Sequence, residues 1–183
     1  VHGHLSHLLA ASSLLSDMGI PVLIHAIADG RDVSPSSAKG YFASLQEQLP
    51  QGAQICTVIG RYYALDRDNR WERVQTAYSA IAQGVGGKAA TAQEVIARAY
   101  ADGQTDEFIP ANVIGDYAGM RPQDGLMCLN FRADRAREIL AALCQPNFDA
   151  FDTAPRVTLS AQMGMVSYSC LLYTSDAADE EDS

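Results

Sequence analysis

Three short apolar runs, separated by segments of helical periodicity, are the feature that most constrains the fold of this chain. The runs read PVLIHAIA, QICTVI and GLMCLN and occupy residues 21–28, 54–59 and 125–130. Continuous apolar runs of this length are typical of strands buried on both faces, as in parallel sheets. Strands that alternate with helices of ten to fifteen residues indicate βαβ units. We therefore predict an α/β fold, with a mostly parallel sheet and helices on both faces.

Between and after these runs, local signals predict five helices and two further strands. The helices are expected at residues 5–18, from Ser34-Pro35 to Leu49, 71–83, 91–100 and 133–143, and the third follows an arginine-rich loop. Thr91 and Glu94 have the spacing of a capping box, which marks a helix start. A strand within 107–114 is expected at a sheet edge, because Pro110 cannot donate to a ladder. A last strand is expected at 156–160.

Length and charge restrict the possible classes of protein. The chain has 183 residues, which suits one domain, and a formal net charge of -9. A general nucleic-acid surface or anionic-membrane surface is therefore not expected. No apolar run reaches the roughly 20 residues that cross a bilayer, and no signal peptide is visible. The four cysteines form no C-x-x-C pair, so we expect a reducing cytoplasm.

The two ends of the sequence differ from its middle. The chain begins at Val1 without an initiating Met, and we expect it to be a piece of a longer protein. Residues 169–183 end in an acidic run with no periodic apolar face, and we predict that they are disordered or foreign to the fold. The folded domain is accordingly expected to span residues 1–168.

Arginines gather in the loops that follow the three apolar runs. Eleven of the thirteen basic residues are arginine, and the three loops are DGRD at 29–32, GRYYALDRDNRWER at 60–73 and RADR at 132–135. Loops at the carboxyl ends of parallel strands share one sheet edge, where ligands bind. Guanidinium groups match carboxylate and phosphate oxygens in pairs. We predict a pocket for a small anion that carries both groups; the alternative is a solvated face of Arg–Asp pairs.

Asp32 is the candidate acid or base in these loops. Neighbouring arginines would lower its pKa and keep it ionised, so that it could accept a proton from a substrate hydroxyl. The alternative is that Asp32 only orients Arg31.

His2, His4 and His7 form an H-x-H-x-x-H pattern at the start of the first predicted helix. Imidazole groups at this spacing could bind a metal ion, and a histidine at a helix start could also donate to a phosphate. The third interpretation is an ordinary polar helix entry.

Long strings in the same loops resemble one enzyme family. VHGH, HAIADGRDVSP, IGRYYALDRDNRWERV, TDEFI and LNFRADRAREI closely resemble the cofactor-independent (2,3-bisphosphoglycerate-independent) phosphoglycerate mutases, in the order of that family and over residues 1–151. Two positions depart from the family pattern. Leu65 replaces the usual methionine, which conserves volume, and Gly3 replaces the serine between the two histidines.

The resemblance implies a fold and an activity. These isomerases are similar to alkaline phosphatases in one domain, which carries a nucleophilic serine and two Mn²⁺ ions, and a second domain inserted into the first holds the glycerate. The chain looks like most of the inserted domain. The implied reaction interconverts 3-phosphoglycerate and 2-phosphoglycerate in glycolysis and gluconeogenesis, in a cytoplasmic monomer whose other part is the phosphatase-like domain. We expect no metal bound by this chain, no nucleic-acid or membrane partner, and no mutase activity from the chain alone.

The resemblance also implies the site residues. Asp32 would be the catalytic acid or base, and substrate would be bound by His2, Arg31, Asp32, Arg61, Arg67, Arg132 and Arg135. Two other functions stay open from the residues themselves. One is a small-anion-binding module without catalysis, and the other is a metal-dependent hydrolase that uses His2 and His4.

Overall fold

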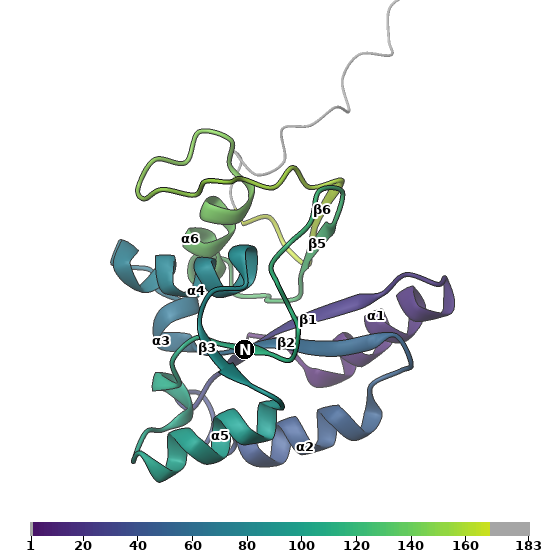
Figure 1. Cartoon of the computed structure of the whole chain (residues 1–183), viewed down its shortest axis with the longest axis vertical. Coiled ribbons are helices and arrows are strands. Elements are labelled where there is room, and N and C mark those ends of the chain that lie inside the picture. Colours follow the sequence, from purple (N-terminus) through teal and green to yellow (C-terminus); the bar gives the residue numbers. More distant parts are fainter. Residues whose placement is uncertain (1, 169–183) are drawn as a thin grey trace, which may run out of the picture.

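A four-stranded sheet forms the centre of the fold in the computed structural model, which describes residues 2–168 (Figure 1). Its strand order is β1-β2-β4-β3, with β1 at Val22–Ala28, β2 at Ala53–Gly60, β4 at Asn112–Ile114 and β3 at Gly87–Ala89. β1 runs parallel to β2, and β3 runs parallel to β4. Because β2 and β4 are antiparallel, the sheet is mixed but mostly parallel, as predicted.

Helices cover both faces of this sheet, which confirms the predicted α/β class. The helices are α1 (Leu5–Asp17), α2 (Ala38–Gln48), α3 (Arg61–Ala64), α4 (Trp71–Gln83), α5 (Ala92–Ala101) and α6 (Ala133–Cys144), with a short 3₁₀ turn, η1, at Asp106–Phe108. β2 shows the two layers most clearly. Ile55 and Val58 join the core formed with α2 and α5, whereas Cys56 and Ile59 join the core formed with α4 and α6.

The third apolar run does not enter the central sheet, so its prediction as an inner strand was wrong. β5 (Gly125–Cys128) pairs in parallel with β6 (Ala161–Gly164) in a separate two-stranded sheet, which lies beside α6 (Figure 1). Its residues alternate between exposed and half-buried. The last strand begins at Ala161, and the strand predicted at 156–160 is irregular backbone.

Two further predictions fail because of contacts from distant residues. β4 lies between β2 and β3 rather than at an edge; Pro110 precedes it, and its carbonyl accepts a hydrogen bond from Asn112 Nδ2 at 2.7 Å. α2 begins at Ala38 instead of Pro35. Asp106 Oδ2 accepts the backbone N–H groups of Ser37 and Ala38, each at 2.8 Å, and so caps the helix from η1.

Local signals were reliable where the partner was near in sequence. Thr91 Oγ1 accepts the Glu94 N–H at 3.2 Å, as the capping box predicts. Gly84, which follows α4, has φ 66, a left-handed conformation suited to a helix end. None of the helices within residues 2–168 has the length and apolar character needed to cross a membrane. The predicted acidic tail, 169–183, lies outside the described residues.

Candidate anion-binding site

The loop after β1 is built around the Asp29 carboxylate. Asp29 Oδ1 accepts the backbone N–H groups of Arg31 at 3.2 Å and Asp32 at 3.1 Å, which closes a tight turn. The same oxygen pairs with Arg61 Nη1 at 2.5 Å. Arg61 follows β2 directly, and the parallel register places Ala28 opposite Gly60. The two strand ends therefore bring this arginine, 3% exposed, to the turn.

Asp32 is the second acid in contact with Arg61. Its Oδ2 lies 3.1 Å from Arg61 Nη1 and 3.0 Å from His2 Nε2, although the histidine contact lacks hydrogen-bond geometry. The hydrogen bond from Arg61 lowers the pKa of Asp32. Burial, followed by the charge of Arg61, lowers the pKa of His2. At neutral pH the pair is therefore a carboxylate beside a neutral imidazole. The Asp32 side chain is 35% exposed to solvent, so a ligand can reach it.

A second group of arginines lies at the start of α6. Asp134 accepts hydrogen bonds from Arg132 Nε at 3.0 Å and from Arg67 Nη1 at 2.9 Å. The Arg132 hydrogen bond, with that of Arg67, lowers the pKa of Asp134 to about 2. The Asp134 carboxylate thus bridges Arg132, two residues before it, and Arg67, which is 67 residues away in sequence.

Arg135 completes this group. Its Nη1 donates to the Leu65 carbonyl at 3.2 Å, whereas its buried Nε has no hydrogen-bond partner within the described part of the chain. Burial lowers the pKa of Arg135, and the charges of Arg67, Arg61 and Arg132 lower it further. Arg135 is therefore close enough to these three guanidinium groups to be repelled by them. An anion would relieve that repulsion and could satisfy the free N–H.

Asn130 joins the two groups. Its Oδ1 accepts the Arg132 backbone N–H at 2.9 Å and lies 3.3 Å from His2 Nδ1. The next residue, Phe131, donates its N–H to the His2 carbonyl at 2.6 Å. The segment that carries His2 is thereby held beside the end of β5. The N-terminal histidine, the β1 and β2 loops and the start of α6 consequently surround one site.

Comparison with known proteins identifies the family. The sequence model of the BPG-independent PGAM N-terminus matches residues 1–170. The chain belongs to this family.

Relatives of the family agree along nearly the whole chain. The 2,3-bisphosphoglycerate-independent phosphoglycerate mutase of Dinoroseobacter shibae is 57% identical over 169 residues, which are 92% of this chain and 34% of the relative. That of Paracoccus denitrificans is 56% identical, over 92% and 33%. A crystal structure of Leishmania mexicana phosphoglycerate mutase at low cobalt concentration superposes with a TM-score of 0.78 and 25% identity, over 90% of this chain and 33% of that chain. The chain spans about a third of the length of these relatives.

In this member of the BPG-independent PGAM N-terminus family, most of the predicted site residues converge. Ion pairs, hydrogen bonds and charge interactions link His2, Asp32, Arg61, Arg67, Arg132 and Arg135. Arg31 is the exception. Its side chain is 62% exposed, and its guanidinium lies 3.5 Å from Glu107 Oε1 instead of pairing with an acid of the cluster.

The histidine pattern does not form a shared metal site. His4 Nδ1 accepts the Ser6 N–H at 3.2 Å and caps α1, while His2 contacts Asp32 and Asn130. Across residues 2–168, no group of three or more His, Cys, Asp or Glu side chains is arranged to hold a metal ion. These residues do not fit the two-metal site implied by the resemblance, and the geometry gives the hydrolase alternative no support.

Sequence reasoning missed three residues of the site: Asp29, Asn130 and Asp134. Each holds a predicted residue and stands one to three positions from one. The D-G-R-D spacing signals the Asp29 turn, because an aspartate often accepts N–H groups two or three residues on. Asn130 and Asp134 each contact Arg132 two residues away, but their other partners, His2 and Arg67, are far away in sequence, and no local pattern reveals those contacts.

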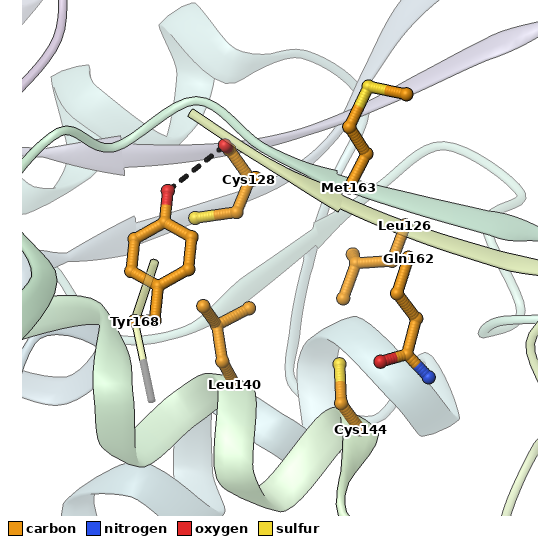
Figure 2. A pocket seen from close by; sticks show the side chains of 8 residues that line it. Leu126, Cys128, Leu140, Cys144, Gln162, Met163 and Tyr168 are labelled. Carbon is orange, nitrogen blue, oxygen red and sulfur yellow. Dashed lines mark hydrogen bonds between the residues drawn. The ribbon is translucent and has the colours of Figure 1, made fainter. Parts of the chain in front are cut away.

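A small pocket lies apart from this site, between α6 and the β5–β6 sheet (Figure 2). Leu126, Leu140, Cys144 and Tyr168 are among the side chains that line it, and Tyr168 donates a hydrogen bond to the Cys128 carbonyl at 3.1 Å. Its volume of about 20 Å³ is room for roughly one water molecule. Because no charged side chain lines it, the arginine cluster is the better candidate for an anion.

Proposed function

We propose that this chain supplies the glycerate-binding part of a phosphoglycerate mutase, which interconverts 3-phosphoglycerate and 2-phosphoglycerate. One observation carries the proposal: Arg61 contacts Asp32, an ionised and partly exposed carboxylate, and the charges of Arg61, Arg67 and Arg132 all act on Arg135. A phosphoglycerate has two anionic groups and a free hydroxyl. The guanidinium groups would bind the anions, and the carboxylate would face the hydroxyl.

The chemistry assigned to this chain is binding and proton transfer. The arginines would hold the glycerate and offset charge as the phosphoryl group leaves one of its oxygens and later returns to the other. In the second transfer Asp32 would accept the proton from the hydroxyl that attacks phosphorus, and in the first transfer of the next cycle it would give that proton to the oxygen that loses the phosphoryl group. Arg61 and His2 would hold Asp32 in place. Between the two transfers the glycerate would turn within the site.

The rest of the protein would hold the phosphoryl group meanwhile. We propose that the nucleophilic serine and the two Mn²⁺ ions implied by the resemblance belong to a phosphatase-like domain outside this chain. Residues 2–168 would then be an incomplete substrate-binding domain of a cytoplasmic, monomeric enzyme of glycolysis and gluconeogenesis. The free thiols of Cys56, Cys128 and Cys144 are compatible with a reducing compartment.

A graft tests the proposal. Residues 2–168 would replace the matched segment of the Dinoroseobacter shibae relative, with which this chain is 57% identical. We expect the grafted protein to interconvert the two phosphoglycerates and the isolated chain to show no turnover. An Asp32→Asn graft that turns over as fast as the parent graft would contradict the role of Asp32, and a folded graft that binds phosphoglycerate without turnover would contradict the proposed function. Turnover by the isolated chain would contradict the division of labour between the two domains.

A further inference from the structure

Two buried acids lie beneath the turn that carries Arg67. Asp66 Oδ2 accepts the backbone N–H groups of Asp68 and Arg70, each at 3.0 Å, and Glu138 Oε1 accepts the Asn69 N–H at 3.0 Å. Asp66 is 5% exposed and Glu138 is 7% exposed. Three consecutive amides are thus held by two carboxyl groups. Asn69 between them has φ 56, a left-handed conformation that this turn requires.

α6 reaches the same turn with more than one residue. Arg135 donates to the Leu65 carbonyl, and Asp134 pairs with Arg67 itself. Glu138 is four residues after Asp134 and three after Arg135, so the three side chains share one face of the helix. The helix that brings Arg132 and Arg135 to the anion site therefore also determines the position of the loop that brings Arg67.

The pKa values of the two buried acids shift in opposite directions. Burial raises the pKa of Glu138, and the neighbouring charges of Asp66 and Asp68 raise it further, against the hydrogen bond from Asn69. Burial acts to raise the pKa of Asp66 as well, but hydrogen bonds from Arg70 and Asp68 lower it overall. Arg73 Nη1, 3.3 Å from Asp66 Oδ1, is the cation of this cluster. The pKa of Asp66 therefore lies below its ordinary value and that of Glu138 above, so Glu138 is the first of the two to accept a proton.

The two carboxyl oxygens of Glu138 differ in their hydrogen bonding. Its Oε2 is buried and has no hydrogen-bond partner among residues 2–168, while its Oε1 accepts the Asn69 N–H. A neutral acid in this position can donate to the Asp66 carboxylate while its other oxygen accepts from the turn. Arg67 is 45% exposed, and among residues 2–168 its side chain pairs only with Asp134, so the turn below it limits where the guanidinium can lie.

We propose that Glu138 is a positioning residue for the anion site: together with Asp66 it fixes the 66–70 turn and thereby sets the position of the Arg67 guanidinium. The proposal rests on the proposed function for the identity of the anion, 3-phosphoglycerate. The hold on the turn itself does not depend on that identity.

The test uses the full 183-residue chain and four variants. Glu138→Ala removes the carboxyl group, and Glu138→Gln keeps an oxygen for Asn69 and a donor for Asp66. Arg67→Ala and the double variant Arg67→Ala/Glu138→Ala separate positioning from a general loss of folding. Glu47→Ala, at an exposed glutamate of α2, is the matched control. The measurements are amide hydrogen exchange without ligand and 3-phosphoglycerate affinity by calorimetry.

Glu138→Ala is expected to lose exchange protection at Asn69 and to bind 3-phosphoglycerate roughly tenfold more weakly, because a charge-assisted contact is displaced. Glu138→Gln should retain protection and affinity, as should Glu47→Ala. The double variant should bind no more weakly than Arg67→Ala, because Glu138 acts through Arg67.

Other results overturn the proposal. If the Asn69 amide is as protected from hydrogen exchange in Glu138→Ala as in the parent chain, Glu138 does not hold the turn. A Glu138→Gln variant that binds 3-phosphoglycerate as weakly as Glu138→Ala would also contradict the proposal. Additive losses in the double variant would show that Glu138 does not act through Arg67. If the parent chain binds no 3-phosphoglycerate, the proposed function fails for the isolated chain. The exchange data would then decide separately whether Glu138 holds the turn.

Discussion

The two halves of the candidate site differ in charge and in burial. Near β1 and β2, the single guanidinium of Arg61 contacts two carboxylates, Asp29 and Asp32, and is 3% exposed. At the start of α6, the single carboxylate of Asp134 is shared by Arg67 and Arg132, with Arg135 close by. Arg67 is 45% exposed. One half has an excess of acid around a buried cation, and the other has an excess of cations near solvent.

This difference separates two tasks. The Arg61 half has its charges paired within the protein, so it can hold a proton acceptor in a fixed place. In the α6 half, three guanidinium groups lie near one carboxylate, that of Asp134, and the buried Arg135 Nε–H lacks a partner among the described residues. A bound anion would balance that positive charge and accept that N–H. A ligand with a hydroxyl at one end and anionic groups at the other suits both. The following predictions test that separation, from the largest expected effect to the smallest.

The largest effect is expected from Asp32→Asn on catalysis. In the graft, turnover should fall by roughly 10²–10⁴-fold, the range for loss of a general acid or base. Affinity for 3-phosphoglycerate should stay the same or rise, because a negative charge leaves the site. Steady-state kinetics and calorimetry measure the two quantities. An affinity loss as large as the rate loss would place Asp32 in binding rather than chemistry.

Arg61→Ala should affect folding more than any other arginine substitution in the site. It leaves Asp29 and Asp32 without their shared cation, and breaking such a buried pair costs about 3 kcal/mol of unfolding free energy. Urea denaturation measures this loss, with Arg67→Ala as the matched variant. If both variants lose the same unfolding free energy, the deeper burial of Arg61 does not contribute to the stability of the fold.

Arg67→Ala and Arg132→Ala should weaken binding and leave the fold nearly intact. Loss of one charge-assisted contact corresponds to roughly tenfold to hundredfold in affinity for 3-phosphoglycerate. Stability should change by less than about 1 kcal/mol, because their pairs with Asp134 are exposed. Calorimetry and denaturation on the same samples test this. Unchanged affinity in both variants would exclude the α6 half as the anion site.

Asp134 gives a smaller effect that depends on pH. Its pKa is about 2 in the folded chain, against 3.8 as the ordinary value, so its stabilising contribution is complete above pH 4. That contribution should disappear as the pH falls from about 4 to about 2. The difference in unfolding free energy between the parent chain and Asp134→Asn should shrink across this window. A constant difference would show that the two arginines do not stabilise the carboxylate.

Arg31→Ala should have the smallest effect. The guanidinium pairs with Glu107 at 3.5 Å, outside the cluster, and its side chain is mostly exposed. We expect affinity for 3-phosphoglycerate and stability to match the parent chain within experimental error, measured as above. A loss comparable to that of Arg132→Ala would mean that Arg31 moves into the site when ligand binds.

The sequence predicts the central part of this fold well because the signals there are local. β2 is buried from Ile55 to Gly60, and its apolar run identifies an inner strand. The run at 125–130 has a similar composition but forms a half-exposed strand in a second sheet. Composition does not specify which strands pair. The start of α2 was misplaced for a similar reason, since its cap comes from Asp106.

The site was predictable to a comparable degree. The idea that loops at one sheet edge bring arginines together applies to Arg61, which follows β2. It applies to Arg132 and Arg135 by a different route, because β5 is outside the central sheet and Asn130 ties its end to His2. Arg31 lies in the predicted loop but points elsewhere. Loop membership therefore predicted proximity, whereas side-chain direction depended on distant partners.

The most direct test is a titration of the chain with 3-phosphoglycerate, followed by NMR of the arginine Nε–Hε groups. The account predicts that Arg67, Arg132 and Arg135 respond together with one dissociation constant, while Arg98 of α5 stays unchanged. Saturable binding that leaves those three resonances unmoved, or that shifts arginines outside the cluster, would contradict it.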